Sequence, residues 1–302
     1  MPADSITSFG FESIPVRGSL VDLRRTWRRI LRDHDHDTLV TETLGHSAAA
    51  TALIAQSLKF EGSITLQIQR GDVLKMLVMQ SSNELALRGM AIVDGEKSAD
   101  NFDTLTKNAL CAVTVDNGDR PYQGIVEVGG NSLAASLEHY FARSVQVPSH
   151  LALVADQQVA GGMLLQQIPG EAIDEDDWRR LHYLVATLST GDFTDNAGIE
   201  LVGKLFAEDD VRVYKPRPVT FHCGCSARKT EDVLKMIGEA EARETLEEQR
   251  QLEVICEFCG RRRTYDAVDV ERLFADNVVL GPDSVQYRKA DSDPNSPKIR
   301  RQ

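Results

Sequence analysis

Apolar and polar residues alternate along several stretches of the chain. The clearest runs from Ser63 to Gln69, where Ile64, Leu66 and Ile68 share one face. A period of two is typical of a half-buried β-strand. Related patterns or short apolar runs predict further strands over 73–79, 85–91, 109–115, 124–128, 151–155 and 159–168. Short polar turns separate the first three of these strands, so we expect hairpins and an antiparallel sheet.

Apolar residues at spacings of three and four predict helices between these strands. Leu20, Leu23, Trp27 and Ile30 have this spacing, which predicts a helix over 18–30. Two more helices are expected over 38–58 and 133–143. Strands and helices mixed in this way predict an α+β domain over residues 1–170.

The stretch Asp33-His34-Asp35-His36-Asp37 lies just before the second predicted helix. Alternating histidine and aspartate could bind a metal. A polar turn is the more common structure for such a stretch, and aspartate is a favoured residue for capping a helix. We therefore expect a turn in which Asp37 caps the helix that follows.

The composition changes after Gly170. Two helices are predicted, from Asp174 to about Ser189 and from Thr194 to about Phe206, followed by an extended stretch from Val211 to Tyr214. Large apolar residues are sparse here. Residues 171–220 are therefore expected to form a helical linker with little core of its own.

Four of the five cysteines form two close pairs, Cys223 with Cys225 and Cys256 with Cys259. Four sulfurs are what a tetrahedral zinc ion requires, so the pairs predict a metal site that binds one zinc per chain. Residues 221–278 would form this small zinc-binding module, with helices over 229–237, 241–251 and 268–274. The module has few bulky apolar residues, so metal would supply much of its stability. The polar tail, 279–302, is expected to be disordered.

Two further residues, His222 and Cys111, are not expected to be metal ligands. His222 adjoins Cys223, but four sulfurs already fill a tetrahedral shell, so we interpret it as a flanking residue. Cys111 lies in a predicted strand, where a lone cysteine is expected to pack in the core as a small apolar residue.

Composition and charge exclude several functions. The 302-residue chain is 42% hydrophobic and 26% charged, which is typical of a soluble globular protein. Its formal net charge of −12 argues against nucleic-acid binding and against docking on an anionic membrane. No signal peptide or membrane span is evident, so we expect a cytoplasmic location. The sequence contains neither a phosphate-binding glycine motif nor a GxSxG nucleophile motif, and we expect no enzymatic activity.

Cysteine spacing alone leaves several functions open. The four thiolates could hold a purely structural zinc, or they could act as a redox switch, because a metal-held thiolate is the oxidisable form of cysteine. A zinc ribbon that binds a partner or nucleic acid is a further alternative, since Arg261-Arg262-Arg263 follows the second pair. A thioredoxin-like enzyme fits poorly, because Cys256 follows a short strand and precedes a turn.

The cysteine pairs are accompanied by a series of other distinctive stretches along the chain: Val16–Gly18, Leu58–Gly62, Leu66–Gln69, Leu87–Gly89, Tyr122–Val126, Ser132–Ala134, Leu137-Glu138, Tyr140-Phe141, Phe221–Ser226 and Cys256–Cys259. On these stretches, nearly the whole chain resembles the Hsp33 family of redox-regulated chaperones. The CxC pair, a loop of thirty residues and the CxxC pair form the most distinctive part of the resemblance. Three positions depart from the family pattern: Val145 replaces an acid, Gly260 an asparagine, and Arg263 an aromatic residue.

The resemblance implies a cytosolic holdase that needs no ATP and is inactive while reduced and zinc-bound. Oxidation would form the disulfides Cys223–Cys225 and Cys256–Cys259, release zinc, and unfold the module and the linker. The exposed surface would bind unfolded or oxidatively damaged client proteins, and the active form would be a homodimer. Neither nucleic acid nor a membrane is an expected partner.

Overall fold

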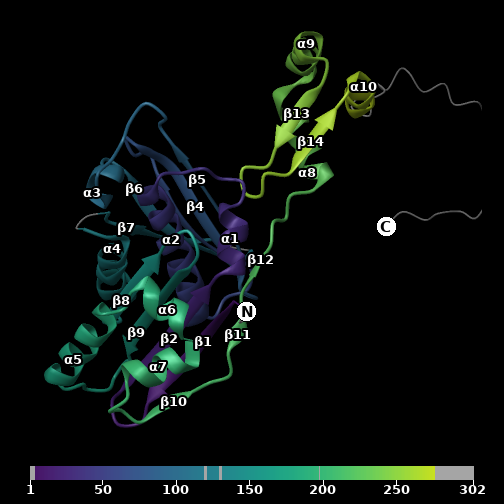
Figure 1. Ribbon diagram of the computed structural model, residues 1–302. Helices are drawn as coiled ribbons and strands as arrows, with labels where there is room; N and C mark the ends of the chain where they lie inside the picture. The colour runs from purple at the N-terminus through teal and green to yellow at the C-terminus, as the bar shows by residue number, and fades with distance from the viewer. Residues whose placement is uncertain (1–3, 119–120, 129–130, 197, 276–302) are drawn as a thin grey trace, which may run out of the picture. The chain divides into compact units, whose positions relative to one another are not determined.

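The computed structural model describes residues 4–118, 121–128, 131–196 and 198–275, and the chain forms two compact units (Figure 1). The first contains the chain up to Gly224 together with Cys256–Gly260. The second contains Cys225–Ile255 and the described residues from Arg261 to Ala275. The predicted tail, 279–302, lies outside the described residues. No helix in the described part of the chain is both long and apolar enough to cross a membrane.

The predicted alternating strands form one sheet in the first unit. Its strand order is β12-β5-β4-β3-β6-β7. The strands are β3 (Ser63–Gln69), β4 (Leu74–Ser82), β5 (Ala86–Val93), β6 (Leu110–Asp116), β7 (Tyr122–Val126) and β12 (Thr220–Phe221). All neighbours are antiparallel except β12, which runs parallel to β5. Ile64, Leu66 and Ile68 are fully buried, as their alternation predicted.

A second sheet has the order β10-β1-β2-β9-β8, and β11 pairs with β1. Its strands are β1 (Ser5–Phe11), β2 (Val16–Leu23), β8 (Ser149–Ala155), β9 (Ala160–Gln167), β10 (Val211–Val213) and β11 (Arg217–Pro218). The strands predicted over 151–155 and 159–168 are confirmed as β8 and β9. Together the two sheets and their helices confirm the α+β fold class.

The prediction of a helix over 18–30 is wrong for the first half of that range. Residues up to Leu23 belong to β2, and the helix α1 spans only Arg25–Leu31. Leu20 packs into one core cluster, whereas Val21 and Leu23 pack into another, on the opposite face of the sheet. Because both faces are covered, the strand carries apolar residues without polar alternation. The apolar residues of β2 therefore happen to have the spacing that is typical of a helix.

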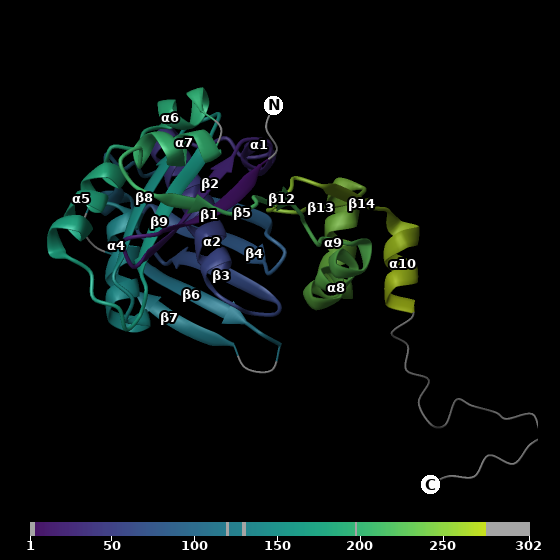
Figure 2. The same cartoon turned by 90° about the horizontal axis from the view of Figure 1, so that it is seen from below.

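Helix α2 (Thr38–Ser57) lies between the two sheets (Figure 2). It begins as predicted, because the Asp37 side chain accepts a hydrogen bond from the Val40 amide at 2.8 Å. The Ala48-Ala49-Ala50 run is fully buried. Small side chains there let the helix approach both sheets at once.

Three shorter helical elements complete the body of this unit. They are α3 (Phe102–Leu105), α4 (Leu133–Tyr140) and the π-helical turn η1 (Phe141–Val145). The first is a single turn inside the stretch 94–107, for which the sequence predicted no element. The last two together match the helix predicted over 133–143.

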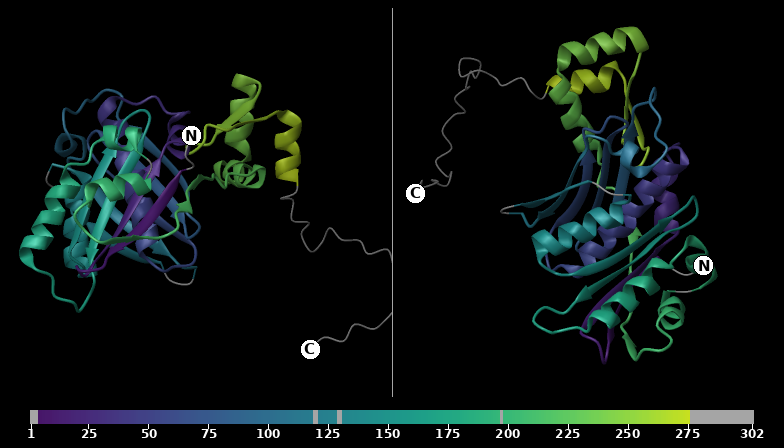
Figure 3. Two further views of the ribbon diagram at one scale, coloured as in Figure 1. Left: turned by 60° about the horizontal axis from the view of Figure 1, so that its bottom comes forward. Right: turned by 90° about the vertical axis from the view of Figure 1, so that its left-hand side faces the viewer.

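Residues 171–220 have a larger core than expected. Their helices are α5 (Glu175–Ala186), α6 (Thr190–Asp195) and α7 (Gly198–Leu205). They cover the face of the second sheet that is turned away from α2 (Figure 3, right). Leu181, Phe193, Val202 and Phe206 are buried there against β1, β2, β8 and β9. The expectation of a thin core was wrong because apolar residues of the sheet join the linker residues in one cluster.

The second unit is small. It contains α8 (Ala227–Ile237), α9 (Glu239–Gln249), β13 (Leu252–Ile255), β14 (Arg262–Tyr265) and α10 (Ala267–Ala275). Strands β13 and β14 form an antiparallel hairpin. The core cluster of this unit consists of seven buried residues: Leu234, Ala242, Leu252, Tyr265, Val270, Leu273 and Phe274. So small a core supplies little hydrophobic stabilisation of its own.

Candidate metal centre

The CxC pair directly follows the edge of a sheet. Phe221, the last residue of β12, pairs with Leu87 of β5, and the His222 amide donates a hydrogen bond to the Leu87 carbonyl at 3.0 Å. Cys223 is therefore only one residue beyond the sheet. Two residues after it, Cys225 precedes Ser226, whose hydroxyl caps α8 by accepting a hydrogen bond from the Lys229 amide.

The CxxC pair forms a tight turn between β13 and β14. The amides of Cys259 and Gly260 both donate to the Cys256 carbonyl, at 3.2 and 2.8 Å. Gly260 has φ of +62°, a left-handed conformation that glycine adopts without strain. We call the segment Cys256–Gly260 the knuckle. Its turn points the Cys256 and Cys259 side chains to a common point.

All four cysteines of the two pairs come together. Their sulfur atoms lie within 4.8 Å of one another, and the Sγ atoms of Cys223 and Cys256 are 3.7 Å apart. A disulfide would need about 2.05 Å, so no disulfide joins these four cysteines in the structure. Zn–S bonds of about 2.3 Å in a tetrahedron separate the sulfurs by about 3.8 Å. The four sulfurs can thus hold a metal ion, and their spacing fits zinc. His222 is not part of this donor group.

Burial makes the thiol form of Cys256 more favourable than its thiolate. Desolvation raises the pKa of Cys256, a hydrogen bond from the Phe258 backbone partly opposes it, and the neighbouring Cys259 and Cys223 thiols raise the pKa further. Thiolates packed this closely repel one another, so a bound cation is what would keep them deprotonated. The four clustered sulfurs are therefore better suited to binding a divalent metal than to existing as four unliganded thiols.

The knuckle also contacts residues of the first unit that the sequence did not indicate as part of the site. The Arg88 guanidinium lies over the Phe258 ring, 4.5 Å from its centroid. Asp33 leaves no room for a side chain at Gly260, where an added Cβ would stand 2.3 Å from the Asp33 Cγ. Asp33 is itself held by Arg29, whose Nη1 lies 2.9 Å from an Asp33 carboxylate oxygen. Nothing in the periodicity of the sequence indicated these contacts.

Cys111, the fifth cysteine, is fully buried in β6. Burial raises the pKa of its thiol to about 12. The prediction that it packs as a small apolar residue is confirmed.

Comparison with known proteins identifies the family. A sequence model of the Hsp33 protein family matches residues 4–266. The chain belongs to the Hsp33 family. It is 40% identical over 276 residues to the 33 kDa chaperonin of Nitrosococcus oceani, a match that covers 91% of this chain and 96% of the relative. It is 37% identical over 290 residues to the 33 kDa chaperonin of Methylobacillus flagellatus, covering 94% and 99%.

Hsp33 architecture is also visible in a solved structure. The crystal structure of the 33 kDa chaperonin from Thermotoga maritima superposes with a TM-score of 0.75 at 23% identity, and the match covers 91% of this chain and 99% of that one. At this identity the likeness concerns the fold alone. It confirms the α+β fold class.

The three departures from the Hsp33 pattern now have a structural setting. Gly260 takes a left-handed conformation, which asparagine also tolerates, so the exchange keeps the turn. Val145 ends η1 and packs partly buried against the main core cluster. Arg263 lies in β14 opposite Val254. None of the three changes a sulfur ligand.

Proposed function

We propose that this protein is an ATP-independent holdase chaperone that oxidation switches on. Membership of the Hsp33 family supports the chaperone part of this proposal. The observation that carries the switch is the convergence of four sulfurs at the point where the chain leaves a sheet edge for a module with a very small core. In the reduced state, one zinc held by Cys223, Cys225, Cys256 and Cys259 would keep that module folded.

The proposed redox step forms two disulfides, Cys223–Cys225 and Cys256–Cys259. To form each disulfide, two thiolates lose two electrons, which together with two protons reduce one molecule of hydrogen peroxide to two of water. Zinc loses its thiolate ligands and leaves as Zn²⁺. Structural zinc contributes on the order of 10–16 kcal/mol to small modules, so its release would unfold this one.

The sheet edges give a route by which unfolding would spread. Cys223 is one residue from the β5 edge, and β12 is held there by only two residue pairs. Before it, β11 and β10 pair with β1, and the helices of the linker precede them. Once the module no longer anchors β12, we propose that the linker, residues 171–220, detaches in turn.

Detachment of the linker would uncover a large apolar surface. The face of the second sheet beneath α5, α6 and α7 presents Phe9, Leu20, Val159, Met163 and Leu165, all buried in the reduced form. An apolar surface of this kind binds unfolded chains without sequence specificity. We propose it as the surface for unfolded or oxidatively damaged clients, in a cytoplasmic protein that dimerises when active.

Zinc release and holdase activity test this proposal together. The zinc-loaded, reduced protein is treated with peroxide under mildly unfolding conditions, and released zinc is measured with a chromogenic chelator. About one zinc per chain should appear, and aggregation of a denatured client should then be suppressed without ATP. Cys111→Ser is the matched control and should respond like the wild type. Zinc that stays bound, or zinc loss with no effect on client aggregation, would refute the switch.

A zinc ribbon that binds a partner or nucleic acid is the alternative. It predicts binding only in the reduced, metal-loaded state, which a gel shift or a pull-down in both redox states would detect. The arginine run gives it little support, because Arg262 pairs with Glu253 across the β13–β14 hairpin at 3.0 Å. A disulfide-exchange enzyme would turn over insulin reduction, which we do not expect.

A further inference from the structure

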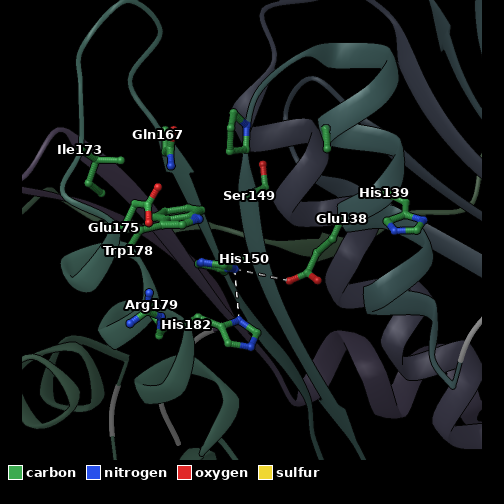
Figure 4. Close-up of a pocket in the computed structure, with 12 residues that line it drawn as sticks. Glu138, His139, Ser149, His150, Gln167, Ile173, Glu175, Trp178, Arg179 and His182 are labelled. Carbon is green, nitrogen blue, oxygen red and sulfur yellow. Dashed lines mark hydrogen bonds and ion pairs between the residues drawn. The ribbon is translucent and has the colours of Figure 1, made fainter.

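A cavity of about 620 Å³ opens in the first unit, away from the four cysteines. Three metal-binding side chains line it and point toward one another: Glu138, His150 and His182 (Figure 4). They come from three successive but separate elements, α4, β8 and α5. Nothing in the chaperone mechanism proposed above uses these residues.

The donor atoms of the three side chains are already close together. The Nδ1 atoms of His150 and His182 are 3.1 Å apart, and the His150 Nδ1 lies 4.0 Å from the Glu138 Oε1. All three donors fall within 4.8 Å of one another. Zinc bound tetrahedrally at about 2.0–2.1 Å needs nitrogen and oxygen donors about 3.3–3.4 Å apart. Small side-chain adjustments would therefore complete a three-ligand site.

Neighbouring groups hold two of these ligands in place. The Leu151 amide donates a hydrogen bond to the Glu138 Oε1 at 2.7 Å, which fixes the carboxylate and leaves further lone pairs for a metal. The Trp178 ring stacks on His150 at 3.8 Å between centroids. Such outer contacts orient the ligands in metal sites. His139 lines the same cavity but lies on the far side of Glu138, away from the two histidine rings (Figure 4).

We propose that Glu138, His150 and His182 form a second site for a divalent transition metal of the zinc class. Two imidazoles favour such metals over magnesium or calcium, which prefer oxygen ligands. A fourth position would face the cavity and take a water molecule. Because His182 belongs to α5, the bound metal would join that helix to α4 and β8.

The site has a consequence for regulation that rests on the proposed function. Helix α5 begins the linker that is proposed to detach on oxidation. A metal bound to His182 would hold the start of the linker on the body of the first unit. The second metal would therefore slow activation without taking part in the thiol chemistry.

Zinc titration of the reduced, full-length protein tests the site. The protein is first loaded with one zinc per chain, and protection of the thiols from a small alkylating agent shows that the cysteines are occupied. Further zinc is then added in a calorimeter. We expect a second equivalent to bind to the wild type and to His139→Ala, and to bind at least ten-fold more weakly to His182→Ala and Glu138→Gln. Amide exchange in residues 175–186 should slow with the second zinc in the wild type and in His139→Ala only.

Two outcomes would overturn the site. The first is the absence of a second binding event in the wild type, which would leave the two histidines as a hydrogen-bonded pair. The second is binding that His182→Ala does not weaken. The experiment involves no oxidation, so its failure is separate from failure of the redox switch. Activation by peroxide at the same rate with and without the second zinc would overturn the regulatory consequence.

Discussion

Phe193 offers the most direct test of whether the linker restrains chaperone activity. Its ring is 1% exposed and packs from α6 onto β9, so closely that a Cβ on Gly161 would lie 2.6 Å from a ring carbon. Truncating a buried phenylalanine to alanine costs about 3–5 kcal/mol. At the lower end, this loss shifts the equilibrium between docked and detached linker about 100-fold toward the detached form. Phe193→Ala is therefore expected to be partly active while reduced and zinc-loaded.

Two measurements on the reduced protein check this prediction. Amide exchange in residues 175–205 should be faster in Phe193→Ala than in the wild type, and light scattering should show suppressed aggregation of a denatured client without oxidant. Phe141→Ala is the matched control, because Phe141 is 2% exposed but lies in the other core cluster. It should destabilise the protein without activating it. Unchanged linker exchange in Phe193→Ala, or equal activation by Phe141→Ala, would refute the reasoning.

Three further predictions concern single side chains. In the reduced, metal-free protein a small alkylating agent should modify four thiols and spare Cys111 until the protein is unfolded, as mass spectrometry would show. Modification of all five would contradict its burial. Gly260→Ala should lose zinc to a chelator faster than the wild type, because a side chain costs about 1–2 kcal/mol in the left-handed region and also collides with Asp33. Gly118→Ala is the control, because Gly118 also has a positive φ but an added Cβ there would meet no neighbouring atom. This variant should retain zinc like the wild type. Equal zinc loss from both variants would argue against the Asp33 contact. Burial lowers the pKa of His46 from 6.5 to about 4, so the unfolded state binds a proton between these values that the folded state does not. Stability should therefore fall by up to about 3 kcal/mol more in the wild type than in His46→Gln as the pH drops from 7 to 4, measured by urea unfolding. Parallel pH profiles for the two proteins would rule this out.

Local patterns were sufficient where one face of a strand is covered, or where a capping residue marks the start of a helix. Strand β3 has the bounds that its alternation predicted, and Asp37 caps α2 as its position before the helix implied. The cysteine pairs were visible for a similar reason, because a metal site built from two tight turns needs its ligands close together in the sequence. The resemblance to the Hsp33 family depended on those same short stretches.

Tertiary structure decided the features that depend on which faces are covered. Strand β2 is apolar on both faces because it lies between two cores, so its spacing suggested a helix. The linker has too few large apolar residues to form a core by itself. Its core is completed by residues of β1, β2 and β9, which the linker sequence does not show. Tertiary packing also brings separate segments together, as in the contact of Arg88 with Phe258 and the cluster of Glu138, His150 and His182. Periodicity records only the environment of neighbouring residues, whereas these contacts follow from how the sheets and helices pack.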